Sequence, residues 1–247
     1  MKVAVCFSGL VRYNALQNIA DYRTIFPYAD FFFHTWEGQS TEEIDEEFYT
    51  TEEPVIDYIA YDSNPQYPFI RLIDKHHLNG EFRNLAYNRP KQIIAHADLL
   101  CHLPEEYDMI VRARYDVKPS LKNNDFWHKI ITEAYDLDQS VGVGYEYNVR
   151  TNMLVHGTPY TQWETPSVIV GVPLFYEEEY HHADHMMIHR RDRFDTDKVY
   201  RLHKNHELFP AEVGWWQILC EEKSRCIYVT NGVLLDKWLK NVNKGTS

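Results

Sequence analysis

The segment that decides the fold spans residues 107–116 and reads Tyr107-Asp108-Met109-Ile110-Val111-Arg112-Ala113-Arg114-Tyr115-Asp116. Its apolar centre predicts a buried strand, because strands that are covered on both faces form continuous apolar runs. Side chains alternate between the two faces of a strand, so Arg112, Arg114 and Asp116 are expected to point the same way. Ligands of an open α/β sheet gather at the carboxyl ends of its strands. The segment therefore predicts a ligand-facing strand end with two guanidinium groups and a carboxylate.

Two interpretations of this cluster remain open at the level of the sequence. In the first, the arginines bind phosphate groups in a bidentate manner, and the carboxylate helps to hold Mg²⁺ or Mn²⁺ beside a diphosphate. In the second, an arginine and the aspartate form an internal ion pair on a surface strand and bind no ligand. Spacing alone does not separate these interpretations.

The flanking segments predict an α/β fold with a mixed central sheet and helices around it. Asn14 and Asn88 are expected to cap the first two helices, and the acidic stretch at residues 42–53 is expected to be a solvated loop or a ragged helix. Strands are predicted at residues 3–7, 29–36, 55–61, 107–117, 141–147, 167–175 and 225–229. Helices are predicted at residues 14–25, 88–103, 124–134 and 210–219.

The composition indicates a globular protein and argues against nucleic acid as a partner. Hydrophobic residues make up 44% of the 247 residues, and the formal net charge is −12. A strongly acidic chain disfavours nonspecific binding to nucleic acid, because backbone phosphates require a basic surface. One domain is expected over residues 1–236, followed by a polar tail at residues 237–247.

Several absences in the sequence favour a cytoplasmic location. No apolar run reaches the ~18 residues that a membrane span requires, and no secretory signal peptide is visible. The four cysteines are widely spread and form no CxxC pair, which gives no support to a zinc knuckle or a redox motif. Cys6 and Cys101 lie in apolar surroundings and are expected to be small buried hydrophobes.

Residues 107–116 also resemble the YDxIxRxRxD signature of a family of small glycosyltransferases with the GT-A fold. Three further segments resemble parts of that family in the same order. They are the opening strand and loop Val3-Ala4-Val5-Cys6-Phe7-Ser8-Gly9-Leu10-Val11-Arg12, the second strand Asp30-Phe31-Phe32-Phe33-His34-Thr35-Trp36, and the helix at residues 91–100. Together these segments cover the first half of the chain.

The resemblance implies a GT-A-like fold and transfer of a sugar from a nucleoside diphosphate donor to a hydroxyl group of a glycan or another acceptor. On this match Asp116 contacts Mn²⁺ or Mg²⁺ and the donor diphosphate. Arg114 stands where a complete DxD motif has its first acid, so the motif is degenerate and strict metal dependence is in doubt. Arg112 and Arg114 would then neutralise the phosphates directly.

The resemblance also assigns Ser8, Gly9 and Arg12 to a nucleotide pocket behind the first strand. Gly9 would let the backbone approach the ligand closely, because glycine carries no Cβ. A plain turn that binds nothing is the alternative for Gly9.

Two carboxylates, Asp184 and Glu212, are candidates for the catalytic base. In inverting transfer, one carboxylate takes a proton from the acceptor hydroxyl. The resemblance implies Asp184, through an acid that precedes an apolar strand. Glu212 opens a predicted helix, where the helix dipole alone would favour an acid. Trp215 or Trp216 would stack on a sugar ring, and packing in the core is the alternative.

A histidine-rich stretch supports a rival function. His185 and His189 are four residues apart, and on a helix both would face one metal ion. On a strand, His189 would instead alternate with its neighbours. The rival function is a metal-dependent hydrolase built on the cluster that begins at His181 and ends at Asp197. A noncatalytic module that binds a nucleotide or a glycan is a further alternative.

Overall fold

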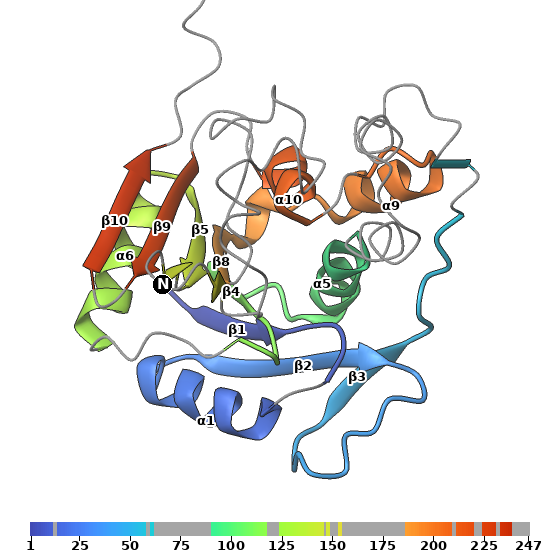
Figure 1. The fold of residues 1–247 in the computed structure, drawn as a ribbon, viewed down its shortest axis with the longest axis horizontal. Coiled ribbons are helices and arrows are strands. Elements are labelled where there is room, and N and C mark those ends of the chain that lie inside the picture. Colours follow the sequence, from blue (N-terminus) through green and yellow to red (C-terminus); the bar gives the residue numbers. More distant parts are fainter. Residues whose placement is uncertain are drawn as a thin grey trace, which may run out of the picture.

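An eight-stranded mixed sheet forms the centre of the protein, and helices cover both of its faces (Figure 1). The structure is a computed structural model that describes residues 1–11, 14–57, 60–61, 90–117, 124–145, 147–148, 153–154, 186–208, 211–219, 224–230 and 233–238. The strands of the sheet are β1 (Val3–Phe7), β2 (Asp30–Trp36), β3 (Phe48–Thr51), β4 (Met109–Ala113), β5 (Ser140–Tyr145), β8 (Met186–Arg190), β9 (Ser224–Thr230) and β10 (Val233–Trp238). The predicted α/β fold with a mixed central sheet is confirmed.

The strands follow the order β10-β9-β5-β8-β4-β1-β2-β3. Strand β1 pairs in parallel with β2 and β4, and β2 pairs in parallel with β3. Strand β8 lies between β4 and β5 and is antiparallel to both, whereas β5 is parallel to β9. Strand β10 closes one edge as the antiparallel partner of β9, and β6 (Tyr147–Asn148) and β7 (Met153–Leu154) form a separate antiparallel pair. Because β8 runs against its neighbours, the sheet is mixed.

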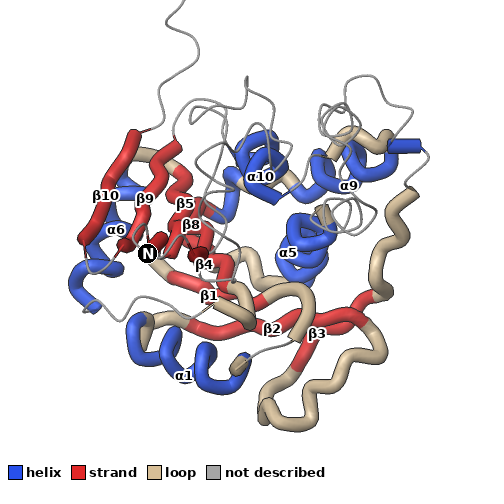
Figure 2. Tube along the Cα trace, in the orientation of Figure 1, coloured by secondary structure: helices blue, strands red, loops and turns tan. Residues whose placement is uncertain are grey.

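The helices form two layers, one on each face of the sheet. They are α1 (Ala15–Ile25), α5 (Lys91–His102), α6 (Asn124–Asp136), η2 (Arg191–Arg193), α9 (Thr196–Lys204) and α10 (Ala211–Leu219). Figure 2 shows α1 on one side of the sheet and α5, α9 and α10 grouped on the other. Met109 and Val111 pack in the same core as α1 and α6, whereas Ile110 packs with α5 and α10. Strand β4 is therefore buried on both faces, as its continuous apolar run predicts.

Two strand predictions need correction. The third strand is β3 (Phe48–Thr51), within the stretch that was expected to be a loop, and residues 55–57 form no strand while residues 60–61 are helical. Strand β3 is a short, partly exposed edge strand, so acidic neighbours do not prevent it from forming. Strand β10 was not predicted, and it runs to Trp238, two residues into the segment assigned to the polar tail. The strand predicted at residues 167–175 lies outside the described residues.

The helix predictions are close to the structure. Helix α1 begins directly after Asn14, but Asn14 has a φ of 49° and its side chain makes no capping hydrogen bond. Pro90 occupies the N-cap position of α5, while Asn88 lies outside the described residues. Helices α6 and α10 are present where the sequence predicts them.

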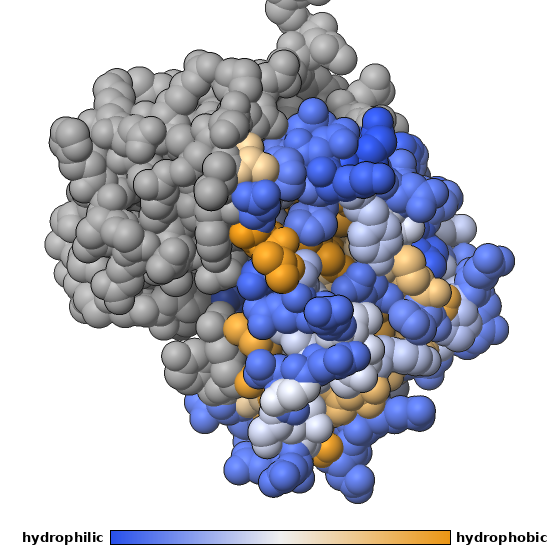
Figure 3. All heavy atoms as spheres, turned by 90° about the vertical axis from the view of Figure 1, so that its right-hand side faces the viewer, coloured by the Kyte–Doolittle hydropathy of each residue, from blue (hydrophilic) through white to orange (hydrophobic). Residues whose placement is uncertain are grey.

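Figure 3 views the molecule from the side toward which β1 and β2 run in Figure 1. The coloured surface on this side is mainly hydrophilic, and apolar residues form separate small areas on it. Within the part of the chain that the structure describes, no helix has the length and apolarity needed to cross a membrane.

Candidate functional site

The candidate site lies at the carboxyl ends of β1 and β4. From β1 the chain passes through α1 to β2 on one side, whereas β4, which α5 precedes, pairs with the other side of β1 (Figure 1). Helices α1 and α5 cover opposite faces of the sheet. The order of the strands therefore reverses at β1, and open α/β sheets bind ligands at such a switch point.

The loop behind β1 gives this edge an open backbone and a buried hydroxyl group. Gly9 has a φ of 102°, a conformation that residues with a Cβ rarely adopt, and a Cβ placed there would meet nothing within 4 Å. Ser8 is buried, and its Oγ has no hydrogen-bond partner among the described residues. The loop can therefore receive a ligand close to its main chain. Arg12, the third residue assigned to this pocket, lies outside the described residues.

Arg112 lies fully buried beneath the same edge. It is paired with Cys6 in the sheet and points into the layer of α5 and α10. Its Nη2 donates a hydrogen bond of 2.9 Å to Oε1 of Gln92 in the first turn of α5. Its Cζ lies 5.1 Å from the ring centre of Trp215, a favourable position for a cation over an aromatic face. Arg112 thus adds positive charge below the site and joins β4 to both helices.

Arg114 and Asp116 form a bidentate ion pair at the end of β4. Nε of Arg114 donates to Oδ1 at 2.9 Å, and Nη2 donates to Oδ2 at 3.0 Å. The two side chains are only 13% and 10% exposed. The internal ion pair that the sequence left open is therefore present, and it lies beside the loop that carries Ser8.

An ion pair of this kind is not by itself a functional signal. Arg190 and Asp192 repeat the same spacing and geometry, with 3.0 Å from Nε to Oδ1 and 2.9 Å from Nη2 to Oδ2. Arg190 ends the antiparallel strand β8 and pairs with Met109, the first residue of β4. This second ion pair therefore lies near the amino end of β4, whereas Arg114 and Asp116 follow its carboxyl end. What distinguishes Arg114 and Asp116 is their position at the switch point.

The described residues do not fit a divalent cation at Asp116. Both of its carboxylate oxygens accept hydrogen bonds from Arg114. Within the described ranges, no three His, Cys, Asp or Glu side chains come together to hold a metal ion. Mn²⁺ or Mg²⁺ at Asp116 stays a prediction.

Tyr115 links the carboxyl-terminal parts of β1 and β2 to the end of β4. The sequence did not single it out. Its hydroxyl group lies 3.0 Å from the carbonyl oxygen of His34 and 3.3 Å from that of Phe7, so one donor reaches the ends of β2 and β1. The side chain of Asn18 in α1 donates to the carbonyl oxygen of Tyr115 at 2.7 Å. The phenol ring packs against Phe7 in the core. These contacts hold the ends of three strands in a fixed relation.

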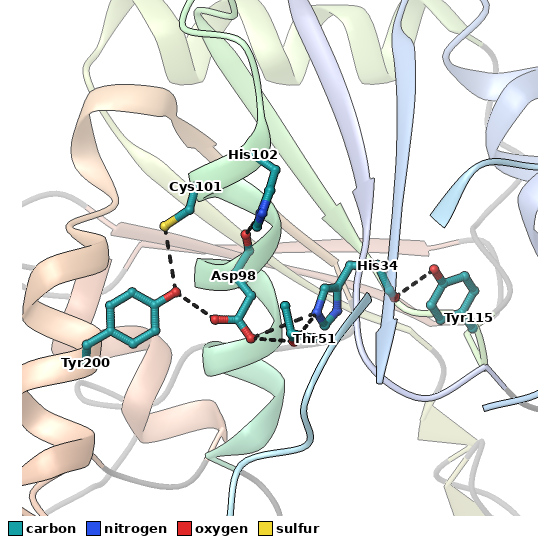
Figure 4. Close-up of polar contacts among 7 residues, drawn as sticks. All are labelled: His34, Thr51, Asp98, Cys101, His102, Tyr115 and Tyr200. Atoms are coloured by element: carbon teal, nitrogen blue, oxygen red, sulfur yellow. Dashed lines mark hydrogen bonds and ion pairs between the residues drawn. The ribbon is translucent and has the colours of Figure 1, made fainter. Parts of the chain in front are cut away.

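The structure also contains a hydrogen-bonded chain of four side chains behind this edge, drawn in Figure 4. Nε2 of His34 lies 2.9 Å from Oγ1 of Thr51, and that Oγ1 lies 2.9 Å from Oδ2 of Asp98. The hydroxyl group of Tyr200 donates to Oδ1 of Asp98 at 2.6 Å. Burial lowers the pKa of His34 to about 4 despite the nearby Asp98, so this imidazole is neutral at neutral pH.

Of the two arrangements left open for His189, the structure has the strand. His189 lies on strand β8, not on a helix, and is fully buried. Its Nε2 lies 3.0 Å from Nε2 of His96 in α5. His181, His182, Asp184 and His185 lie outside the described residues. Residues 186–190 are thus a strand, and the helix that would turn His185 and His189 toward one metal ion does not form over these described residues.

The second candidate base and its neighbours lie on α10. Glu212 is in the first turn of this helix, and for Glu212 and Trp216 the structure describes the backbone. Trp215 is fully buried, in contact with Arg112, Phe194 and His96. Trp215 therefore packs in the core and is not available to stack on a sugar.

Comparison with known proteins gives similarity to solved structures alone. No family model matches the chain, and no curated protein matches it. The galactosyltransferase LgtC, solved with donor and acceptor sugar analogs, is 10% identical, with a TM-score of 0.40 over 88% of this chain and 70% of that one. Mouse xyloside xylosyltransferase 1 in its apo form is 14% identical, with a TM-score of 0.34 over 86% of this chain and 78% of that one. At these scores the likeness carries no inference about activity.

Proposed function

We propose that this chain is a glycosyltransferase that binds a nucleoside diphosphate sugar at the switch point and transfers the sugar to a hydroxyl acceptor. The observation that carries the proposal is the convergence at one sheet edge of an open backbone at Gly9, a buried hydroxyl group on Ser8 and the guanidinium group of Arg114. A diphosphate needs cationic and hydrogen-bonding groups of this kind. The resemblance of residues 107–116 to a glycosyltransferase signature supports the same assignment.

To promote the transfer, the site must stabilise the negative charge that develops on the departing diphosphate. Arg114 lies beside the β1 loop, and Arg112 adds a positive charge from below. Fixed cations in a partly buried site stabilise a developing negative charge more effectively than water does, because they need no reorganisation. A carboxylate takes the proton of the acceptor hydroxyl group, and Asp184 and Glu212 are the candidates for this role.

A metal-independent route is favoured among the described residues, because Arg114 replaces the first acid of a DxD motif and engages both oxygens of Asp116. Mn²⁺ or Mg²⁺ held by Asp116 is the competing version, and adding the ions to the binding assay separates the two.

Calorimetric titration of the chain with UDP, GDP and CMP, each with and without Mn²⁺, tests the binding step. A matched pair of double variants identifies the site. Arg114→Gln with Asp116→Asn removes both charges at the switch point and keeps two polar side chains that can still bond each other. Arg190→Gln with Asp192→Asn does the same at the opposite edge.

We expect UDP or GDP to bind the wild type, and affinity to fall about tenfold or more in the first double variant only. If the two double variants bind the nucleotide with equal affinity, the binding site is not at Arg114 and Asp116. If the wild type binds no nucleotide, the proposal is overturned. Release of UDP or GDP from the matching nucleotide sugar then separates a transferase from the noncatalytic module. That module binds the nucleotide sugar and leaves it intact.

A further inference from the structure

A row of three polar residues crosses three neighbouring strands near their carboxyl ends. Phe7 in β1 is paired with Ala113 in β4 and with Phe33 in β2. The residues that follow Phe7, Ala113 and Phe33 in the chain are Ser8, Arg114 and His34, respectively. Side chains alternate along a strand, so these three share the face that α5 covers. Parallel strands are about 4.8 Å apart, so Ser8 lies between the other two, and Arg114 and His34 are about 10 Å apart.

Two members of this row carry polar atoms without a partner. Ser8 is 4% exposed and His34 is 0% exposed. Neither Oγ of Ser8 nor Nδ1 of His34 has a hydrogen-bond partner among the described residues. Buried polar groups are nearly always hydrogen-bonded, so two neighbouring exceptions require an explanation.

The hydrogen-bonded chain of Figure 4 determines which nitrogen of His34 carries the proton. Thr51 has one hydroxyl proton, and its Oγ1 contacts both His34 and Asp98 at 2.9 Å. A carboxylate can only accept a hydrogen bond, so Thr51 donates to Asp98 and must accept from Nε2–H of His34. Nδ1 is therefore unprotonated. It carries a lone pair that accepts no hydrogen bond from the described residues. His34 can offer an acceptor at this position and no donor.

We propose that His34 is a specificity-determining residue of the nucleotide site, where its Nδ1 accepts a hydrogen bond from an O–H or N–H group of the nucleoside. Thr51 and Asp98 are positioning residues, because they fix the tautomer that makes Nδ1 an acceptor. This inference rests on the proposed function. A phosphate group would be repelled by the lone pair, so the phosphates lie toward Arg114 and the nucleoside toward His34.

The neutral state that this role requires is provided by the surroundings. Burial is the largest cause that lowers the pKa of His34, and His102 acts in the same direction. Asp98 opposes them, but the pKa still lies at about 4. Nδ1 therefore keeps its lone pair throughout the neutral range.

The first test examines the protein without ligand. Imidazole ¹⁵N chemical shifts report which nitrogen carries the proton, and His34→Gln assigns the signals. We expect a protonated Nε2 and an unprotonated Nδ1 for His34. Thr51→Val should lose this fixed tautomer, whereas Thr51→Ser, which keeps the hydroxyl group, should retain it. A protonated Nδ1 in the wild type would overturn the inference even if UDP binds.

The second test uses two substitutions, each of which replaces a different nitrogen of the imidazole. In His34→Gln the amide nitrogen can replace Nε2 and still donate to Thr51, but no acceptor remains at Nδ1. In His34→Asn the shorter amide places an acceptor near Nδ1 and gives up the contact with Thr51. We expect UDP or GDP to bind about tenfold more weakly to His34→Gln, and His34→Asn to lose less. Thermal unfolding of each variant shows whether it is folded, and Thr51→Val replaces His34→Gln if the latter does not fold.

Ligand analogues identify the donor. The 2′-deoxy form of UDP lacks one ribose hydroxyl group, and N3-methyl-UDP lacks the base N–H. One of the two should bind the wild type more weakly than UDP does, and His34→Gln should bind that analogue and UDP equally. If His34→Gln binds UDP as tightly as the wild type, the inference is wrong while the proposed function stands. If no nucleotide binds the wild type, the proposed function fails and this inference fails with it.

Discussion

The imidazole rings of His96 and His189 face each other between α5 and the sheet, with their Nε2 atoms 3.0 Å apart. Nδ1 of His189 lies 2.8 Å from the carbonyl oxygen of Arg190, which can only accept, so this nitrogen carries the proton. Nε2 of His189 is then an acceptor, and Nε2 of His96 must donate to it. Both rings are neutral and fully buried. Burial lowers the pKa of His189 to about 4 and the pKa of His96 well below its ordinary value.

Acidification is therefore expected to destabilise the protein. In the unfolded chain both histidines take up protons near pH 6.5. In the folded state His189 resists protonation down to about pH 4, and burial holds the pKa of His96 well below its ordinary value. Stability is complete above pH 6.5 and falls as the pH decreases through this window, by up to about 1.4 kcal/mol per pH unit and histidine. The free energy of unfolding, measured with urea at several pH values between about 7.5 and 4.5, should change less steeply with pH in His96→Leu than in the wild type. The exposed His128→Gln should keep the wild-type slope, and an unchanged slope in His96→Leu would contradict the prediction.

The ion pair of Arg114 and Asp116 is expected to be strongly coupled. Its side chains are 13% and 10% exposed, so loss of one partner leaves a largely buried charge on the other. A double-mutant cycle with Arg114→Gln and Asp116→Asn should give a coupling energy of about 2 kcal/mol in urea unfolding. The same cycle on Arg190 and Asp192, which are 30% and 65% exposed, should give less than about 1 kcal/mol. Similar coupling in both cycles would mean that the switch-point pair is no better shielded.

Removing one hydroxyl group at Tyr115 should loosen the site edge. Tyr115→Phe leaves the carbonyl oxygens of His34 and Phe7 without this donor and should cost about 1–2 kcal/mol in the free energy of unfolding. Nucleotide affinity should fall as well, because these carbonyl groups belong to the strand ends that carry the site. Tyr28→Phe, on an exposed side chain, is the control and should change neither quantity. Wild-type stability of Tyr115→Phe would contradict the prediction, because it would mean that the two carbonyl oxygens do not depend on this hydroxyl group.

Cys6 and Cys101, the cysteines whose side chains the structure describes, should differ in reactivity. Cys6 is fully buried in β1, and burial raises the pKa of its thiol strongly, so the thiolate that alkylating agents attack is disfavoured. Cys101, which was expected to be buried, is exposed near the end of α5. Iodoacetamide on the native protein, followed by peptide mass analysis, should label Cys101 well before Cys6. Comparable rates would indicate that β1 opens readily.

Sequence patterns predicted the buried centre of the fold because burial on both faces leaves a continuous apolar run. Strands β1 and β4 have such runs, and both were predicted. Strand β3 was missed because it is short, at the sheet edge and only partly buried, so its side chains need not be apolar. A stretch of alternating residues at 55–61 was preferred in its place.

Within the site, the sequence predicted positions along the chain but not partners across it. Ser8 and Gly9 were proposed through the family resemblance, and Arg114 through its place at the end of a predicted strand. The chain from His34 through Thr51 to Asp98 was not found, since its members are 17 and 47 residues apart and share no local spacing. The pairing of Arg114 with Asp116 was foreseen only as one of two possibilities, because an i, i+2 spacing is compatible with both.

The late arrival of β8 sets an order for completing the sheet. Strand β4 ends at Ala113, but its second neighbour begins only at Met186, and β5 pairs with that same late strand. Until β8 is in place, β4 offers an unpaired strand edge that is apolar except for Arg112, and such an edge invites aggregation. The two halves of the sheet are thus joined by one five-residue strand, and a ribosome must synthesise past Arg190 before the fold can close.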